Sequence, residues 1–355
     1  MERKIIKILR YIFAPILALL VPLYYFVFLL IKHIRIRRQK RFQNIKVICV
    51  GNFTLGGSGK TTVVKTIVED LKKLGKSCGI ITRGYKRKNK NDIILLLPEK
   101  NYGYDYVEKV GDEAFMLFSK LSVPICVSSD RNKAIEILKD KVSIVISDDG
   151  YQNFSFYKDL NVLVINLFDF KNINFLFPLG NLREPMGSAI KRADYVVLNH
   201  SKFVNDKVIE KAKQRVKKFN KKAKIITSYY KIDNFVNLYT KKSFFIKDFT
   251  SYYLDVNICC GVGGGEEVFV RMIELEGLNV KNKFFYSDHY KYKIEDVKKW
   301  AKFNLPLVLT HKDAVKLSPY LDKLDKFYFE KIFYTNIKLE IDEGKDIWEE
   351  MINTI

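Results

Sequence analysis

The residues best suited to chemistry form a glycine-rich segment near the start of the chain. Residues 51–62 read GNFTLGGSGKTT and follow a short β-branched stretch, KVICV, at residues 46–50. An apolar helical pattern over residues 63–74 comes directly after them. A glycine loop between a strand and a helix turns successive backbone N–H groups toward phosphate oxygens at the N-terminus of the helix. The segment therefore predicts a nucleotide-binding P-loop.

The side chains of this loop have distinct predicted roles. Lys60 supplies a charge for the β- and γ-phosphates of ATP, and the Thr61 hydroxyl is suited to bind Mg²⁺. The standard motif has glycine at position 54, where this chain has threonine. The predicted nucleotide-binding residues form one continuous run: Thr54, Leu55, Gly56, Gly57, Ser58, Gly59, Lys60, Thr61 and Thr62.

Two acidic residues follow a second apolar stretch. Residues 143–146 lead into Asp148, Asp149 and Gly150. In an open parallel sheet, ligands bind at the carboxyl edge of the strands. Either carboxylate can therefore hold Mg²⁺, directly or through water. An ordinary Asp-Asp-Gly turn is the alternative, and the P-loop makes it the less favoured interpretation.

The order of apolar strands and amphipathic helices predicts an α/β fold with a parallel sheet. The same alternation restarts after a lysine-rich helical segment at residues 206–219 and predicts a second, smaller α/β domain. The glycine run GVGGG at residues 261–265 does not predict a second nucleotide site, because no acidic residue follows at the required spacing. The expected organisation is a membrane anchor at 1–40, a P-loop domain at 41–200 and the smaller domain at 201–355.

The N-terminus carries a predicted membrane segment. Residues 11–31 contain no charge over 21 positions, and a helix needs about 20 apolar residues to cross a bilayer. Basic residues flank the segment and are denser after it, which places the body of the protein in the cytoplasm. A cleaved signal peptide is less favoured because the apolar run is too long. Pro15 and Pro22 would kink the helix, so an anchor lying in the membrane plane remains open beside a spanning helix.

The overall charge favours an anionic partner. The formal net charge is +22, with 62 Lys and Arg against 40 Asp and Glu, which suits nucleic acid, an acidic membrane surface or a phosphorylated substrate. No nucleic-acid-binding motif accompanies the charge, so we expect no nucleic acid partner. The five cysteines show no metal-binding spacing and suit a reducing compartment.

Further short motifs occur in a fixed order along the chain. They are GGSGKTT (56–62), RGY (83–85), GDE (111–113), SDDGYQ (147–152), LREP (182–185), DH (288–289) and KDAVKL (312–317). Together they resemble the tetraacyldisaccharide 4'-kinase family, the lipid A 4'-kinases. The resemblance implies that ATP and Mg²⁺ are used to phosphorylate the 4'-hydroxyl of a tetraacyldisaccharide 1-phosphate, a glycolipid, at the cytoplasmic face of the inner membrane. It also implies two α/β domains with the active site in the cleft that the smaller domain closes.

The resemblance assigns roles to individual residues. Asp112 is implied as the catalytic base and His289 as its partner from the second domain. In the LREP segment, Arg183 is suited to clamp phosphate and Glu184 to support the metal. A surface ion pair is the alternative for these two residues. The chain departs from the family pattern at Asn153, where histidine is usual, and at Thr62, where proline is common. Neither change removes a group that phosphoryl transfer requires.

The main alternative is a membrane-associated P-loop ATPase of the regulatory or partitioning type. Its loop carries a signature lysine at the position that Leu55 occupies here, and this difference favours the kinase. A non-catalytic basic lipid-binding protein is a second alternative. It does not explain a P-loop accompanied by acidic residues.

Overall fold

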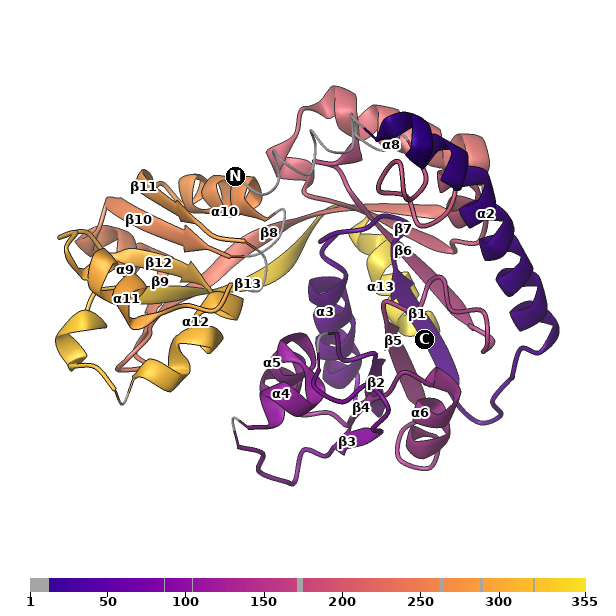
Figure 1. The fold of residues 1–355 in the computed structure, drawn as a ribbon, viewed down its shortest axis with the longest axis horizontal. Helices are drawn as coiled ribbons and strands as arrows, with labels where there is room; N and C mark the ends of the chain where they lie inside the picture. The colour runs from indigo at the N-terminus through magenta and orange to yellow at the C-terminus, as the bar shows by residue number, and fades with distance from the viewer. Residues whose placement is uncertain are drawn as a thin grey trace. The chain divides into compact units, whose positions relative to one another are not determined.

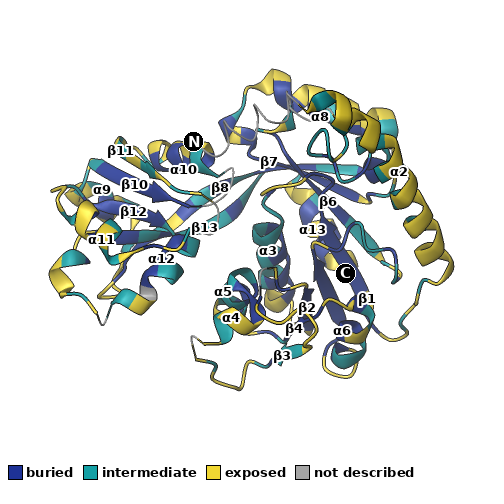
Figure 2. Cartoon of the chain, in the orientation of Figure 1, coloured by how far each residue is buried: buried dark blue, intermediate teal, exposed yellow. Residues whose placement is uncertain are grey.

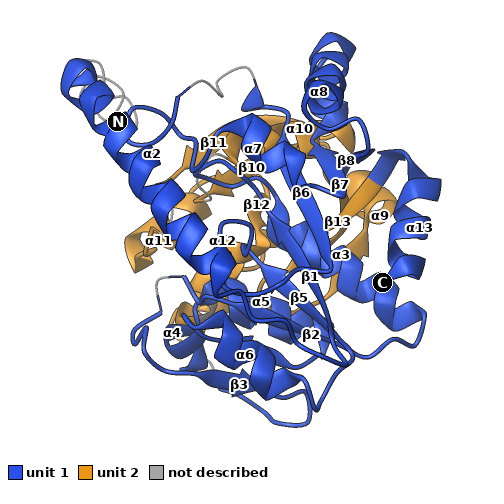
Figure 3. Cartoon of the chain, turned by 90° about the vertical axis from the view of Figure 1, so that its right-hand side faces the viewer, with its two compact units in different colours: residues 1–229, 341–355 blue, residues 230–340 orange. Residues whose placement is uncertain are grey.

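The computed structural model describes residues 13–85, 87–103, 105–170, 175–261, 265–287, 290–321 and 323–355. These residues form two compact units (Figure 3). Unit 1 comprises residues 1–229 and 341–355, and unit 2 comprises residues 230–340. In each unit, helices pack on a largely parallel sheet, as the sequence predicts (Figure 1).

The boundary between the units differs from the predicted domain change near residue 200. Strand β8 (Lys224–Asn237) runs without a break from unit 1 into unit 2, and β13 (Ile332–Glu343) runs back. Because both crossings lie inside continuous strands, no glycine- or proline-rich linker marks them in the sequence. The chain then ends in a helix of unit 1, α13 (Lys345–Thr354). The sequence pattern does not predict β13 or α13.

The sheet of unit 1 is parallel except at one edge, where β3 runs antiparallel to β4. Its strands, in spatial order, are β8, β7 (Tyr195–Asn199), β6 (Leu160–Asn166), β1 (Lys46–Gly51), β5 (Ile144–Asp148), β2 (Cys78–Thr82), β4 (Ile125–Val127) and β3 (Ile94–Leu96). This arrangement confirms the predicted P-loop-type sheet. Strand β1 pairs with both β5 and β6, and Val50 is in register with Asp148. The glycine loop after β1 and the acids after β5 therefore leave the sheet side by side.

Helices cover both faces of this sheet. They are α3 (Lys60–Lys73), α4 (Tyr106–Val110), α5 (Asp112–Leu121), α6 (Arg131–Leu138), α7 (Met186–Lys191) and α8 (Asp206–Phe219), with α13 and the N-terminal α2 (Ala14–Arg37). Val47 and Cys49 of β1 pack in the cores formed with α6, α7 and α8. Helix α3 packs on β1, β2 and β5 and is joined by α5 and α13. Because side chains alternate along a strand, helices α3, α5 and α13 cover the opposite face of the sheet.

Helix α2 lies along the outside of unit 1 (Figure 1). Among the described residues it is the one helix long and apolar enough to cross a membrane, with a mean hydropathy of 2.4. None of its residues is buried, and Figure 2 shows most of its length as exposed.

Unit 2 holds the remaining strands of the same sheet, which β8 and β13 continue from unit 1. Its strands are part of β8, β9 (Ser243–Phe245), β10 (Asp255–Cys260), β11 (Asn279–Phe285), β12 (Leu307–Thr310) and part of β13. Its helices are α9 (Ile246–Tyr252), α10 (Glu266–Leu275), α11 (Ile294–Ala301) and α12 (His311–Leu317). Helices α11 and α12 share a core with Cys259 and Leu309, while Phe249 of α9 stacks on Phe235 with ring centroids 4.0 Å apart.

One large side chain, Trp348, packs helix α13 against the rest of unit 1. Trp348 is 4% exposed, and its indole Nε1 donates to Asp70 Oδ2 of α3 at 2.9 Å. Lys76 Nζ donates to the carbonyl oxygens of Ile352 and Asn353 at 3.1 and 3.0 Å. These lysine bonds satisfy carbonyl groups that the end of a helix leaves without intrahelical partners.

We expect Trp348→Ala to destabilise unit 1 by about 3–5 kcal/mol, because truncating a buried tryptophan leaves a cavity. Asp70 Oδ2 also loses its indole donor, while Oδ1 keeps its bond from Lys73. Thermal unfolding of the purified protein measures the effect. Glu349→Ala, at the exposed neighbouring position, is the control and should shift stability by less than about 0.5 kcal/mol. Equal midpoints for the tryptophan variant and the control would show that α13 does not stabilise the unit.

Candidate active site

The P-loop has the backbone conformation that phosphate binding requires. Gly59 is the N-cap of α3 and has φ 87°, and Gly56 has φ 112°. Both values lie in the left-handed region, which glycine adopts without steric cost. The first turn of α3, beginning at Lys60, therefore presents its free N–H groups toward the loop. The Thr54 backbone, at the position where the standard motif has glycine, forms a bridge with Leu182.

Two asparagines that the sequence analysis did not identify donate hydrogen bonds to backbone carbonyl groups of the P-loop. Asn166 ends β6, and its Nδ2 donates to the Gly57 carbonyl at 3.3 Å. Asn199 ends β7, and its Nδ2 donates to the Ser58 carbonyl at 3.4 Å. An amide donor on a loop carbonyl turns that oxygen away from an anionic phosphate. The detectable signal was a polar residue closing an apolar strand at the carboxyl edge of a parallel sheet.

Asp149 joins the P-loop lysine to Arg183. Lys60 Nζ lies 3.5 Å from Asp149 Oδ1. Arg183 NH1 donates to both Asp149 oxygens, at 2.9 and 3.0 Å. Burial raises the pKa of Asp149, but Lys60 and Arg183 outweigh it and hold the pKa below its ordinary value. The carboxylate is therefore ionised at neutral pH, and the two cations are held at one point beside the glycine loop.

The pKa of Asp148 is shifted in the opposite direction from that of Asp149. The Asp148 side chain is 4% exposed, and its Oδ1 has no hydrogen-bond partner among the described residues. Burial, with the nearby charges of Glu113 and Asp149, raises the pKa of Asp148 to about 7, against the opposing effect of Lys60 and Arg131. A buried oxygen aligned with the start of the P-loop and lacking a donor is suited to receive a cation.

The contacts of Glu184 do not suit the predicted role of supporting a metal ion. It is fully buried, and its two oxygens each accept a bond of 2.8 Å from the guanidinium of Arg192. Gln152 Nε2 also donates to Glu184 Oε1 at 3.0 Å and to the Asn52 carbonyl at 2.7 Å. A carboxylate occupied in this way is the anchor of a buried ion pair. We therefore correct the predicted metal role of Glu184 to the positioning of Gln152 behind the P-loop.

Asp112 is the first residue of α5, directly after Gly111 with φ 91°. A Cβ at Gly111 would lie 2.9 Å from the Tyr85 carbonyl, so the RGY segment packs closely against the GDE motif. Asp112 Oδ1 accepts from the Glu113 N–H at 3.2 Å. Helix α5 packs on α3, the helix that follows the P-loop.

Comparison with known proteins decides the family. A family profile described as Tetraacyldisaccharide-1-P 4'-kinase matches residues 14–355. The chain belongs to the tetraacyldisaccharide 4'-kinase family. A tetraacyldisaccharide 4'-kinase of Legionella pneumophila is 30% identical over 307 residues, covering 86% of this chain and 82% of the relative. One from Elusimicrobium minutum is 31% identical over 327 residues, covering 89% and 84%.

The fold also matches a solved member of the 4'-kinase family. A crystal structure of LpxK from Aquifex aeolicus in complex with ATP superposes with a TM-score of 0.70 and 24% identity, covering 97% of this chain and 99% of that one. The resemblance seen in the ordered motifs is thereby confirmed, as is the α/β fold.

The structure gathers most of the predicted site residues in unit 1. The P-loop run from Thr54 to Thr62 lies beside Asp148 and Asp149, and Arg183 contacts Asp149 directly. Within the loop, Leu55 is 43% exposed and Ser58 is buried. His289 lies outside the described residues, so its pairing with Asp112 stays a prediction.

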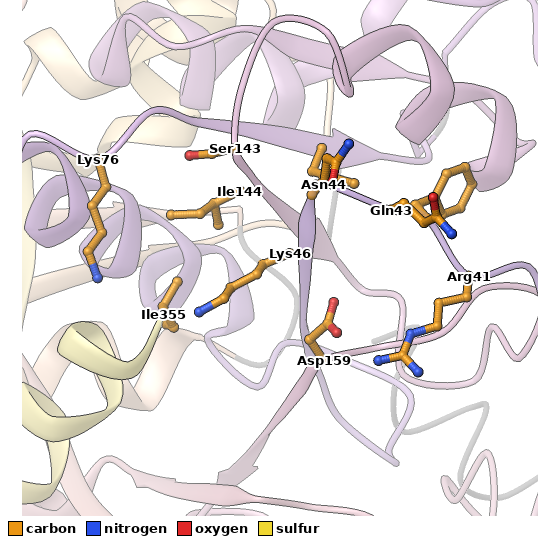
Figure 4. Close-up of a pocket in the computed structure, with 11 residues that line it drawn as sticks. Arg41, Gln43, Asn44, Lys46, Lys76, Ser143, Ile144, Asp159 and Ile355 are labelled. Carbon is orange, nitrogen blue, oxygen red and sulfur yellow. The ribbon is translucent and has the colours of Figure 1, made fainter.

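A pocket of about 750 Å³ lies at the amino ends of the strands of the same sheet (Figure 4). Lys46 and Ile144, where β1 and β5 begin, line it together with Lys76, Asp159 and Ile355. Lys46 and Lys76 donate to carbonyl oxygens at the end of α13. These contacts relate the pocket to the packing of the C-terminal helix, while the P-loop lies at the carboxyl ends of the strands.

The two neighbouring acids should affect stability in opposite directions. In the folded protein the pKa of Asp148 is raised to about 7, so this group contributes stability at low pH that is lost as the pH rises toward 7. Asp148→Asn should therefore stabilise the metal-free protein at pH 8 by about 2–4 kcal/mol, with the gain disappearing near pH 4.

Asp149→Asn is the matched control. The pKa of Asp149 is lowered, so its carboxylate contributes stability above its ordinary pKa that is lost in acid, and its removal should destabilise the protein at pH 8. Thermal unfolding in EDTA from pH 4 to 8 measures both variants. A loss of stability at pH 8 in Asp148→Asn would contradict the assignment of Asp148 as the strained member of the pair.

Proposed function

We propose that this chain is a kinase of lipid A biosynthesis that transfers the γ-phosphate of ATP to the 4'-hydroxyl of a tetraacyldisaccharide 1-phosphate. The observation that carries this function is the network of Lys60, Asp149 and Arg183 at the glycine loop, in a chain that matches the 4'-kinase family over residues 14–355. Phosphoryl transfer depends mainly on positioning and on neutralising phosphate charge. This network supplies both.

The cations have complementary tasks in this proposal. The N–H groups at the start of α3 and Lys60 Nζ bind the β- and γ-phosphates. Arg183 carries a planar guanidinium that is suited to two parallel bonds with phosphate oxygens. Because Asp149 holds Arg183 beside Lys60, the guanidinium is already ordered where charge develops during transfer.

The residues at this site fit Mg²⁺. The described ranges contain no group of three or more His, Cys, Asp or Glu side chains that could hold a metal alone. Mg²⁺ is usually bound by one or two protein groups together with substrate phosphates. The Thr61 hydroxyl and the unpaired Asp148 Oδ1 are the groups we propose for it, with Asp149 close by. When bound, Mg²⁺ neutralises charge on the β- and γ-phosphates.

Asp112 is the proposed base for the acceptor hydroxyl. A carboxylate in the first turn of a helix is stabilised by the positive end of the helix dipole, and Asp112 is the first residue of α5. It can accept the proton of the sugar 4'-hydroxyl as the phosphoryl group transfers. His289 is the proposed partner of this carboxylate, on the resemblance alone.

The proposed setting is the cytoplasmic face of the inner membrane. The substrate carries acyl chains, and the exposed apolar helix α2 provides a means of keeping the enzyme at the same surface. The basic residues Arg35, Arg37, Arg38, Lys40 and Arg41 follow it and are attracted by anionic headgroups, each by about 1 kcal/mol. The partitioning ATPase receives no comparable support, because Leu55 stands in place of its signature lysine.

Purified protein with radiolabelled ATP, Mg²⁺ and tetraacyldisaccharide 1-phosphate in detergent should form the bis-phosphorylated lipid. Lys60→Ala should reduce transfer by about 10²-fold or more, because it removes a charge that acts on the transferring group. Thin-layer chromatography of the lipid product measures both. Hydrolysis of ATP by the wild type without any lipid phosphorylation would support the ATPase instead.

Asp112→Asn should lower kcat by about 10²–10⁴-fold, the usual contribution of a positioned base, while leaving ATP affinity within about twofold. Steady-state kinetics and the binding of a fluorescent ATP analogue separate the two effects. Glu113→Gln changes the adjacent acid of the same helical turn and should affect kcat much less. If Asp112→Asn weakened nucleotide binding as much as turnover, Asp112 would not be the base.

A further inference from the structure

Helix α2 has two different faces. Side chains spaced three or four residues apart are partly buried against the rest of unit 1: Ala14, Leu17, Val21, Tyr24, Phe28 and Lys32, with Tyr25 partly buried beside Tyr24. The opposite face exposes apolar side chains, among them Leu19, Leu23, Phe26, Val27 and Leu30, which are between 43% and 79% exposed. An apolar helix that uses one stripe for packing leaves the other stripe available to a lipid surface.

The inner stripe contacts the loop that carries Arg183. The Tyr24 hydroxyl donates to the Arg183 carbonyl oxygen at 2.7 Å. The Tyr24 ring packs edge-on against Phe177, with centroids 5.5 Å apart. One turn and two turns further on, Phe28 packs against Phe154 at 6.1 Å and Lys32 Nζ donates to the Ser188 hydroxyl at 3.5 Å.

The same loop is bonded to the P-loop on its other side. The Arg183 N–H donates to the Phe53 carbonyl at 2.8 Å, and the Leu55 N–H donates to the Asn181 carbonyl at 2.7 Å. The backbone of Arg183 is thus held between α2 and the nucleotide loop. Its guanidinium reaches Asp149 from this position.

We propose that Tyr24 is a positioning residue that couples the seating of α2 on a lipid surface to the placement of the Arg183 guanidinium. The coupling runs from the Tyr24 hydroxyl to the Arg183 backbone, and through the side chain to Asp149 and Lys60. It rests on the proposed function, because Arg183 acts on the phosphoryl group in that reaction.

The same contacts favour an orientation of α2 in the plane of the membrane. Tyr24 lies within the uncharged segment of residues 11–31, yet it bonds to a loop of unit 1. A helix crossing the bilayer would bring this loop, with its arginine and acidic neighbours, into hydrocarbon at a cost of several kcal/mol. An in-plane helix, with Leu23 and Phe26 toward the acyl chains, avoids this cost.

Tyr24→Phe tests the coupling, because it keeps the ring against Phe177 and removes only the hydroxyl. Kinetics are measured with the full chain on vesicles of phosphatidylethanolamine and phosphatidylglycerol that contain the disaccharide lipid. We expect kcat to fall about five- to tenfold, the usual effect of one lost hydrogen bond. The KM for ATP and vesicle co-sedimentation should stay within about twofold. Tyr25→Phe, the neighbouring tyrosine stacked on Phe28, is the matched control and should behave as wild type.

A double-mutant cycle shows whether Tyr24 acts through Arg183. In an Arg183→Ala background, Tyr24→Phe should have no further effect on kcat, because the guanidinium that it positions is gone. An unchanged kcat in the single variant, or an equal additional loss in the double variant, would overturn the coupling. Wild-type activity on the lipid is measured first, so failure of the proposed function appears as the absence of any product and is distinguishable from either result.

The exposed face is tested separately. The double substitution Leu23→Gln and Phe26→Gln should weaken vesicle binding by about tenfold or more, because two large apolar side chains lose their burial in lipid. The folded state should be unaffected, since both residues are exposed. Unchanged vesicle binding would overturn the assignment of this face to the lipid surface.

Discussion

The ion pair between Arg183 and Asp149, with Lys60 at 3.5 Å, is the interaction on which the site depends. Three separate segments meet in it: the helix after the glycine loop, the turn after β5 and the loop before α7. The two cations would repel each other without the carboxylate that both contact, and Asp149 offsets that cost. The arrangement holds two positive charges together beside the glycine loop, and preorganised charge of this kind is what electrostatic catalysis uses.

The neighbouring acid shows how one turn provides two kinds of carboxylate. Asp148 and Asp149 are adjacent in sequence, but Asp148 ends β5 and is buried, while Asp149 lies in the following turn with φ 53° and contacts the cations. The pKa of the buried acid rises to about 7, while that of the paired acid falls. A buried carboxylate without a donor is unfavourable in the isolated protein. Such local strain is tolerated where the surrounding fold is stable and where a bound cation can relieve it.

Support for this centre comes from residues that do not touch phosphate. Asn166 and Asn199 hold the carbonyl groups of the P-loop, and Gln152 links the loop to the buried pair of Glu184 and Arg192. On the outer side, α2 bonds to the Arg183 backbone. A catalytic group needs this kind of second support to hold its position within a fraction of an ångström. The anchor helix is therefore part of the active-site scaffold in our proposal as well as a means of membrane attachment.

The sequence by itself determined the α/β class, the P-loop, the acids after β5, the apolar N-terminal helix and the family. These features depend on local patterns, namely strand and helix periodicity, glycine spacing and short ordered motifs, which need no knowledge of distant contacts. Only the tertiary structure decided which partner each polar side chain takes. It placed Glu184 in an ion pair with Arg192, brought Asn166 and Asn199 under the loop, and returned α13 to unit 1 through the continuous strands β8 and β13. These contacts join residues far apart in the chain, and their geometry follows from strand order and register, which spacing along a single sequence does not encode.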